Sequence, residues 1–319
     1  MTSPNISVIL PSYNYAEYLP ETLESLARQT FPSWELVAVD DGSTDGSLDI
    51  LRAFAETRPG QARILTHPNN DNRGLAETLQ TAIENCHGDI VAFLEADDIW
   101  VPRALALYSS ASESCPEAVV VHGAAQMFGD AELVQQRSEQ YRWKGFPSPK
   151  TTGCPYEALP FLLRGNVTMT LSSIAVRREA LLSLDWNTPH DAWLDWWLLS
   201  QLSARGQFFY EPSPVVRWRL HRKSYNVQYG ERIQDLEKES RIYIAEIRRM
   251  LVTALSNDDG GIDSVRRRAV TRILEGADCS ERSRGSAVLR AAKRMFPSPV
   301  KNALKRIFFE WRMCYNQDR

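Results

Sequence analysis

The chain has 319 residues, of which 43% are hydrophobic and 24% charged, the composition of a soluble globular protein with one large domain or two small ones. Its formal net charge of −3, from 37 Lys and Arg against 40 Asp and Glu, gives no overall attraction to nucleic acid or another polyanion. The five cysteines are scattered without a C-x-x-C pair, which excludes a disulfide framework or zinc site of the usual spacing and favours a reducing cytoplasm.

The amino-terminal stretch MTSPNISVILPSYN has no basic segment followed by a long apolar run, and nowhere do about eighteen apolar residues stand together. We therefore expect neither a signal peptide nor a membrane-spanning helix, and a cytoplasmic location. The N-x-S/T matches at Asn5 and Asn166 are consequently interpreted as chance sequons.

The first hundred residues alternate short apolar runs with amphipathic segments, which predicts βαβ units and a mostly parallel sheet. Strands are expected at ISVILP, WELVAVDD, ARILTH and DIVAFLEADD. Helices are expected at EYLPETLESLARQT, directly after DGSTDGS, and at GLAETLQTAIENC. Candidate caps for the second helix are Ser43, Thr44 and Asp45.

Polar residues follow three of these predicted strands, at 11–14, 40–43 and 95–98. The carboxyl ends of parallel strands meet at one edge, where open α/β sheets bind ligands. We therefore expect the three clusters to converge on one rim.

After residue 100 the pattern changes. The polar segment from Phe128 to Pro155 predicts a long loop or a small excursion over the sheet. A strand and a helix are expected at TLSSIAVRREALLSL, an aromatic-rich helix ending at Gly206 at DAWLDWWLLSQLSARG, and a strand pair broken by prolines at GQFFYEPSPVVRWRLHRKSYN. From Glu231 an apolar stripe predicts a further helix, so a domain or subdomain boundary is expected near residue 228.

The stretch FLEADDIW places Glu95, Asp97 and Asp98 directly after an apolar run. One interpretation is a solvated strand end whose Asp caps the next helix. The other is a site for Mg²⁺ or Mn²⁺ held jointly with a diphosphate, because these ions prefer oxygen ligands. The VDDGSTD cluster favours the second, since a carboxylate there can accept the N3–H of uracil or thymine. Tyr13 is either a stacking platform for the base or an ordinary rim aromatic.

Taken in order, SVILPSYNYAEYLPETLESLARQTFPSWELVAVDDGSTDGS and GDIVAFLEADDIWVP resemble the family 2 glycosyltransferases, which have the GT-A fold. The resemblance covers roughly the first 225 residues. It implies an α/β fold with a Rossmann-like, mostly parallel nucleotide-binding sheet flanked by helices. The implied catalytic domain spans 1–228, with a nucleotide-sugar half at 1–100 and an acceptor half at 101–228, followed by a helical C-terminal region at 229–319.

The resemblance also implies roles for the rim residues. Asp98 resembles the family's metal ligand, Asp97 is placed for ribose or metal, and Glu95 stands where the family often has another Asp, so its role stays open. The residues that resemble nucleotide contacts are Pro11, Tyr13, Asp40, Asp41 and Arg73. The implied cofactor is Mn²⁺ or Mg²⁺. The family's frequent Arg-Asn pair in the third helix is replaced here by Leu79 and Gln80.

The acceptor hydroxyl requires a base, and HDAWLDWWLLSQL offers Asp191 and Asp195 on nearly the same helical face. LDWWLL resembles the family's motif with Asp195 as the base, and Leu194 stands where the family usually has another acid. Asp191 is therefore the reserve candidate. The alternative is that either aspartate caps the aromatic helix.

His221 lies in WRLHRKS, which is similar to the family's R-x-H-x-x-S segment. It either completes the metal or diphosphate site or is a structural histidine. In the first case Arg219 or Arg222 would neutralise phosphate.

Residues 282–312 carry nine Lys or Arg against the single acid Glu310, a net charge of 9 − 1 = +8. One face of the predicted helix is apolar and consists of Val300, Leu304, Ile307, Phe308 and Trp311. Such a basic amphipathic helix either lies on an anionic membrane surface or packs on the protein. In the first case we expect a lipid-linked acceptor and a protein located at the inner face of the membrane.

The expected function is transfer of a sugar, with inversion, from a nucleoside-diphosphate sugar to the hydroxyl of a saccharide or lipid-linked saccharide in surface polysaccharide or glycolipid assembly. Asp41 favours UDP or dTDP. Two alternatives stay open, a nucleotide-sugar-binding module without catalysis and a Mg²⁺-dependent phosphoryl-transfer domain. The second lacks a G-x-x-x-x-G-K-[ST] loop, and the missing G-x-G-x-x-G disfavours a nicotinamide enzyme.

Overall fold

The parts of the chain described by the computed structural model are residues 5–144, 155–189, 191–225, 227–228, 236–256, 262 and 264–275. Contacts group Met1–Val270 into one compact unit and Thr271–Arg319 into another. The contacts thus divide at residue 270 and not near residue 228, where the sequence predicts a boundary. All the elements below belong to the first unit.

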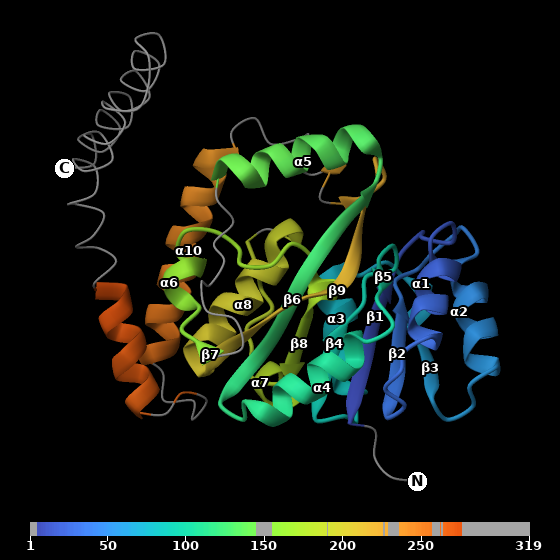
Figure 1. The fold of residues 1–319 in the computed structure, drawn as a ribbon, viewed down its shortest axis with the longest axis horizontal. Helices are drawn as coiled ribbons and strands as arrows, with labels where there is room; N and C mark the ends of the chain where they lie inside the picture. Colours follow the sequence, from blue (N-terminus) through green and yellow to red (C-terminus); the bar gives the residue numbers. More distant parts are fainter. Residues whose placement is uncertain are drawn as a thin grey trace. The chain divides into compact units, whose positions relative to one another are not determined.

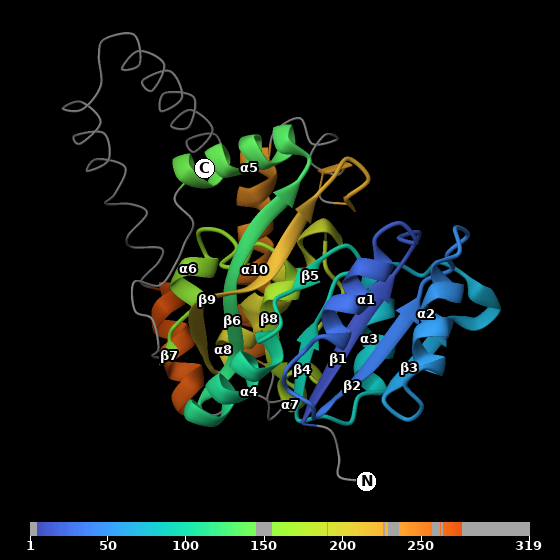
Figure 2. The same ribbon diagram turned by 45° about the vertical axis from the view of Figure 1, so that its right-hand side comes forward.

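The amino-terminal half of the sheet consists of four parallel strands (Figures 1 and 2). They lie in the spatial order β3 (Ala62–Thr66), β2 (Trp34–Asp40), β1 (Ile6–Ser12) and β4 (Ile90–Phe93). The helices between them are α1 (Leu19–Ala27), α2 (Ser47–Glu56) and α3 (Leu75–Glu84), with a short 3-10 turn η1 at Pro68–Asn70. The alternation of strands and helices expected for this half is confirmed.

The second half of the sheet mixes strand directions. Its strands are β5 (Ile99–Trp100), β6 (Ala118–Gly129), β7 (Pro155–Tyr156), β8 (Ile174–Arg177) and β9 (Gln207–Leu220). Strand β8 is antiparallel to both β4 and β6, whereas β6 and β9 run parallel. Among the described residues the nine strands form one sheet in the order β3-β2-β1-β4-β8-β6-β9-β5, with β7 paired to β9.

The remaining helical elements cover this second half. They are α4 (Ala104–Ser114), α5 (Ala131–Lys144), α6 (Leu159–Leu162), η2 (Leu171–Ser173), α7 (Arg178–Leu181), η3 (Asp191–Trp193), α8 (Leu194–Arg205) and α10 (Leu236–Ser256). Within the described residues, no helix is long and apolar enough to cross a bilayer.

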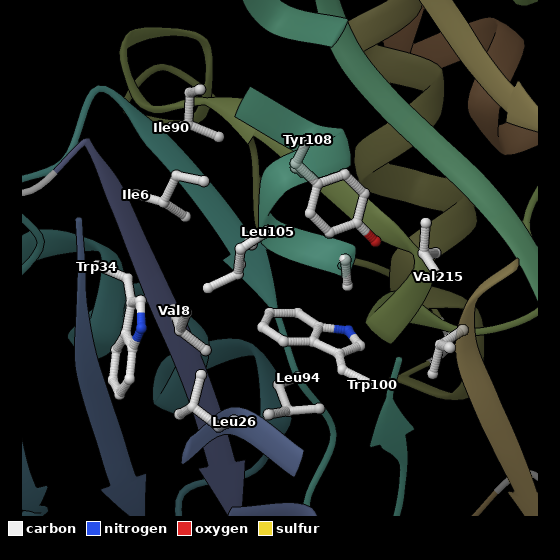
Figure 3. Packing of buried hydrophobic residues seen from close by; sticks show 14 of the residues in the cluster. Ile6, Val8, Leu26, Trp34, Ile90, Leu94, Trp100, Leu105, Tyr108 and Val215 are labelled. Atoms are coloured by element: carbon white, nitrogen blue, oxygen red, sulfur yellow. The ribbon is translucent and has the colours of Figure 1, made fainter. Parts of the chain in front are cut away.

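One hydrophobic cluster links the two halves (Figure 3). Val8 of β1 and Leu26 of α1 belong to it together with Trp100, which is 2% exposed. The indole Nε1–H of Trp100 donates to the Ser172 carbonyl at 2.7 Å, so the ring is buried without an unpaired donor. Burial of one such aromatic side chain contributes about 2–3 kcal/mol, and this one ties β5 to η2.

Two expectations for the second half are wrong. Residues 207–220 form one long strand rather than a strand pair. The strand continues past its prolines because its register against β6 shifts between Gly123 and Ala125. Pro212 and Pro214 fall at this irregularity, where the hydrogen-bond ladder is interrupted and proline is tolerated.

The segment from Phe128 to Pro155, expected as a loop, contains the end of β6 and the helix α5. Asp130 starts this helix, since its Oδ1 accepts the backbone N–H groups of Glu132 and Leu133 at 3.0 and 3.2 Å. The polar composition that suggested a loop is that of a solvent-facing helix.

Helix α8 ends at Gly206 as expected. Glycine is required at this position by lack of space and not by backbone strain, because a Cβ at Gly206 would lie 2.3 Å from Val119 Cγ1 on the neighbouring strand.

Candidate active site

The loops after β1 and β2 meet at the carboxyl edge of the sheet, where Ser12 and Asp40 are register partners (Figure 2). Asn14, with φ of 57°, ties the loops together: its backbone N–H donates to Ser43 Oγ at 3.0 Å, and its Oδ1 accepts the Thr44 N–H at 2.8 Å. This crosslink leaves the Tyr13 side chain 46% exposed at the rim.

Gly46, in a left-handed conformation, occupies the N-cap position of α2 and has no side chain to cap it. Asp45, one of the expected caps, bonds the first turn from one position earlier, because its Oδ1 accepts the Ser47 N–H at 3.1 Å. The same carboxylate also accepts the Ala16 N–H at 3.0 Å and the Ser47 hydroxyl at 2.6 Å, which holds the rim.

Asp41 is buried and holds the loop before α3. Its two carboxylate oxygens accept the backbone N–H groups of Arg73 and Gly74 at 2.6 and 3.0 Å. The Arg73 guanidinium pairs with Glu77 at 2.6 Å on α3. The structure therefore brings Asp41 to the backbone of Arg73, while the Arg73 side chain extends along the helix.

Asp40 and Pro11 lie beside Asp41. Asp40 is 0% exposed, and its Oδ1 accepts the Ser43 N–H at 2.9 Å. Asp40 Oδ2 is buried without a hydrogen-bond partner among the described residues, and so is the Oγ of Ser12, which faces Asp40 in the register of β1 and β2. Pro11 is partly buried on β1.

The carboxylates of Glu95 and Asp98 share one hydroxyl, that of Thr170. Thr170 Oγ1 lies 2.8 Å from Asp98 Oδ2 and also contacts Glu95 Oε2. A threonine has a single proton to donate, so it cannot serve two ionised carboxylates at once. Burial and the charges of Asp97 and Glu95 raise the pKa of Asp98 well above its usual value. Burial, followed by the charge of Asp97, raises the pKa of Glu95 to about 7.

Asp98 is satisfied entirely by the protein. It is 0% exposed, and besides the Thr170 hydroxyl it accepts the Arg219 backbone N–H at 2.9 Å on Oδ1. Asp98 thus joins β9 to the segment before η2.

Asp97 pairs with His221 across the sheet. Asp97 Oδ2 lies 2.9 Å from His221 Nε2, and His221 Nδ1 is buried without a partner among the described residues. The Tyr18 ring lies 4.4 Å from the imidazole, centroid to centroid. The Arg219 guanidinium donates from Nε to the Asp97 carbonyl at 2.7 Å and ion-pairs with Glu21. These contacts hold the Asp97 loop and the end of β9 together.

Two tyrosines of this site were not predicted. The ring centroid of Tyr15 lies 5.9 Å from that of His221. Burial and then the charges of Asp97, Glu95 and Asp98 raise the pKa of Tyr15. The available signal was the repeated aromatic in PSYNYAEYL, which contains Tyr15 and Tyr18.

Asp195 lies in the first turn of α8. Its Oδ2 accepts from the side-chain amide of Asn166, and its Oδ1 accepts the Trp196 N–H at 2.8 Å. Burial raises the pKa of Asp195 to about 6. Asn166 lies four residues before Thr170, whose hydroxyl contacts Glu95 and Asp98, so one short segment links Asp195 to the carboxylate cluster. Asp191 begins η3, and its side chain lies outside the described part of the structure.

A family model described as Glycosyl transferase family 2 matches residues 7–183. The chain belongs to glycosyltransferase family 2. The matched range contains the three rim clusters, Thr170 and Asn166, whereas Asp195 and His221 lie beyond it.

Several curated glycosyltransferases are similar in sequence to this family 2 chain. An uncharacterised Nostoc glycosyltransferase is 33% identical over 135 residues, 42% of this chain and 41% of that protein. The Bacillus subtilis putative teichuronic acid biosynthesis glycosyltransferase TuaG is 41% identical over 97 residues, 30% of this chain and 37% of that protein. The Escherichia coli glucosyltransferase WfgD, which acts on GlcNAc-diphosphoundecaprenol, is 29% identical over 133 residues, 42% and 48% of the two chains. The chain thus matches less than half the length of each of these relatives.

Two solved structures share the fold. S. aureus TarS in complex with UDP-GlcNAc superimposes with a TM-score of 0.56 at 17% identity, over 85% of this chain and 70% of that one. A mannosyltransferase from Pyrobaculum calidifontis, in complex with GDP-Man and Mn²⁺, gives 0.51 at 20% identity, over 98% and 84%. The expected GT-A fold, with a mostly parallel sheet, is confirmed.

The donor set of the family 2 site suits a divalent cation. Asp97 and Asp98 have carboxylate oxygens of the kind that such an ion prefers, although both Asp98 oxygens already accept hydrogen bonds, and His221 Nδ1 has no partner among the described residues. No three His, Cys, Asp or Glu side chains of the described residues form a ready-made metal cluster. Such a partial set fits Mg²⁺ or Mn²⁺, which usually take one or two protein carboxylates and complete their shell with water and phosphate.

Thr170→Val should destabilise the protein by about 1–3 kcal/mol, because it leaves two buried carboxylate oxygens without their shared donor. Urea denaturation measures the loss. The matched control is Thr168→Val, which removes an equally buried hydroxyl that bonds the neutral amide of Asn166 at 3.3 Å and should cost less than about 1 kcal/mol. Equal losses in the two variants would contradict the bridging role.

Proposed function

We propose that the protein is an inverting, metal-dependent glycosyltransferase that moves a sugar from a nucleoside-diphosphate sugar to an acceptor hydroxyl. The observation that carries the proposal is the approach of two groups with different chemistry. One is the carboxylate cluster of Glu95, Asp97 and Asp98, and the other is Asp195. The short segment 166–170 bonds both groups, because the Asn166 amide donates to Asp195 and Thr170 Oγ1 contacts Glu95 and Asp98. A site with both can hold a metal diphosphate beside a base.

The donor nucleotide would bind at the rim formed by the loops after β1 and β2. The exposed ring of Tyr13 offers a stacking face, and it follows Pro11 and Ser12, the register partner of Asp40, at the end of β1. Each Asp41 oxygen already accepts one backbone N–H and keeps further acceptor capacity, so it can also receive the N3–H of a uracil or thymine base. Arg73 lies next to Asp41 and can move from Glu77 to the nucleotide, since that pair is exposed. UDP or dTDP is therefore favoured.

Asp97 and His221 are the first candidates to hold Mn²⁺ or Mg²⁺ with the diphosphate, and Asp98 is the next. Asp97 is 9% exposed at the edge of the cluster, whereas both Asp98 oxygens are bound by the protein. When bound, the ion would neutralise charge on the departing diphosphate. Arg219 stands beside Asp97 and adds positive charge. Glu95, with its raised pKa, is proposed to share a proton with Thr170 rather than to bind metal.

Asp195 would act as the base. It removes the proton of the acceptor hydroxyl while that oxygen forms a bond to the anomeric carbon, and the bond to the diphosphate oxygen breaks with its electron pair. No enzyme nucleophile takes part, so the configuration inverts. Asn166 holds one carboxylate oxygen of Asp195 by its amide and leaves the other lone pairs for the acceptor. Asp191 stays the reserve candidate.

Thermal-shift measurements test the donor class. We expect UDP or dTDP sugars with Mn²⁺ to raise the unfolding temperature, by about 4–5 °C when the ligand is at ~100 times its Kd. The matched ligand is the corresponding CDP sugar, whose cytosine lacks the N3–H and should give a smaller shift. If no nucleoside diphosphate stabilises the protein, the proposed function is wrong.

The acceptor is proposed to be a saccharide or a lipid-linked saccharide, in surface polysaccharide or glycolipid assembly on the cytoplasmic side of a membrane. Support comes from TuaG and WfgD, whose names state teichuronic acid biosynthesis and a diphosphoundecaprenol acceptor. Residues 282–312, with a net charge of +8, would contact anionic lipid. This segment lies outside the described residues.

A chain ending at residue 280 tests the membrane contact. It should lose cosedimentation with anionic liposomes, because the basic segment is gone, and should keep hydrolysis of the sugar donor. Neutral phosphatidylcholine liposomes serve as the control, since the full chain should bind them weakly. Undiminished binding of the shortened chain to anionic liposomes would contradict the proposal.

A further inference from the structure

Helix α10 brings a tyrosine to the turn that carries Asp195. Tyr243 is 0% exposed, and its ring centroid lies 5.0 Å from that of Trp193, 5.3 Å from Trp196 and 6.1 Å from Trp197. Two of these tryptophans flank Asp195 in sequence. Figure 1 shows α10 beside α8, so a helix expected outside the catalytic domain packs against the helix that carries the candidate base.

The Tyr243 hydroxyl lies in a directed chain of hydrogen bonds. It lies 2.8 Å from the Trp193 carbonyl oxygen and 2.9 Å from Thr188 Oγ1. A carbonyl accepts only, so the single phenolic proton is donated to Trp193. The Thr188 hydroxyl must then be the donor to the Tyr243 oxygen. The hydroxyl protons of Thr188 and Tyr243 are therefore both donated, and the hydrogen bonds run from Thr188 to Tyr243 to Trp193.

The carbonyl that accepts the last of these hydrogen bonds belongs to Trp193, the N-cap residue of α8. Trp193 has φ of −121° and ψ of 24°, outside the helical range, and Asp195 follows two residues later in the first turn. The two side-chain contacts of Asp195, from Asn166 and from its neighbour's N–H, set its rotamer but not the backbone beneath it. Tyr243 bonds that backbone and packs against the rings on both sides of it.

We propose that Tyr243 is a positioning residue for Asp195, which makes α10 part of the catalytic apparatus. This inference rests on the proposed function, in which Asp195 is the base. Tyr243 is too deeply buried to touch substrate itself. It acts by holding the N-cap carbonyl of α8 where the carboxylate points at the acceptor, and errors of about 1 Å in such placement cost up to ~100-fold in rate.

The test is Tyr243→Phe, which keeps the ring and removes the hydroxyl. We expect kcat to fall about tenfold, with the KM for the sugar donor unchanged, because the donor rim is untouched. The matched control is Tyr156→Phe, which removes another buried phenol hydroxyl, 2.7 Å from His122 Nε2 on β6. It should reduce stability by a similar amount and leave kcat within about twofold.

A mutant cycle separates this inference from the function on which it rests. If Tyr243 acts through Asp195, Tyr243→Phe should cause no further loss of the residual transfer by Asp195→Asn. An equal tenfold loss in both backgrounds, or a kcat loss no larger than that of Tyr156→Phe, would overturn the positioning role. If Asp195→Asn itself keeps full activity, the proposed base is wrong instead.

Discussion

Asp195→Asn should lower kcat for sugar transfer by about 10³-fold, within the 10²- to 10⁴-fold range of general-base catalysis. The amide has the same shape and can still accept the hydrogen bond from Asn166, but it cannot take a proton. The affinity for UDP should be unchanged, because the proposed nucleotide contacts lie at the rim beyond β1 and β2. Steady-state kinetics and isothermal titration calorimetry measure the two quantities.

Asp191→Asn is the matched control, since it removes the same charge four residues earlier, in η3. It should retain most of the activity. If Asp191→Asn loses transfer and Asp195→Asn does not, the base is the reserve candidate. If the wild type binds UDP sugars but neither transfers nor hydrolyses them, and Asp195→Asn behaves identically, the protein is a nucleotide-sugar-binding module.

The pH profile gives a second readout of the same group. Burial raises the pKa of Asp195 to about 6, and the base is active only when it is ionised. Therefore kcat/KM, which reports the free enzyme, should rise with pH through about 6 and level off above it. A profile that stays flat from pH 5 to 7 would contradict this assignment.

Asp97→Asn should abolish the Mn²⁺-dependent part of donor binding and lower kcat/KM by about 10³-fold, because it removes a charged ligand from the proposed diphosphate site. Without metal, the Asp97→Asn variant should be no less stable than the wild type. The Asp97 charge raises the pKa values of both Asp98 and Glu95, so its removal relieves repulsion inside the cluster. Thermal shifts with and without Mn²⁺, together with kinetics, measure both effects.

Two variants sharpen this result. Asp49→Asn removes one carboxylate from an exposed position on α2 and should change neither activity nor the Mn²⁺ response. Asp98→Asn should mainly reduce stability, since both Asp98 oxygens bond protein groups. If the Mn²⁺ response is lost in Asp98→Asn and kept in Asp97→Asn, the metal ligand is Asp98, as the family resemblance implies.

Local patterns in the sequence were sufficient for the amino-terminal half of the fold. Runs such as ISVILP and WELVAVDD are mostly apolar because β1 and β2 are buried along nearly their whole length, and such runs are typical of buried parallel strands. Parallel strands also end at one edge, so clusters after three strands could be predicted to lie at a common rim. The family resemblance rests on these same local motifs.

The second half escaped this reasoning for identifiable reasons. The α5 segment is polar on most of its surface, so its composition does not differ from that of a loop, and its only local signal was the cap at Asp130. The prolines of β9 suggested a break between two strands, whereas the register shift against β6 accommodates them within one strand.

The sequence by itself determined which residues are candidates for the chemistry: the carboxylates of the rim, Asp195 and His221 all stand in recognisable motifs. Only the tertiary structure decided their partners. Thr170 meets Asp98 across 72 positions, His221 meets Asp97 across 124, and Tyr243 meets Trp193 across 50. Such pairs depend on strand order, register and helix packing, which are set by the burial of the whole core, and no periodicity within a short segment encodes them.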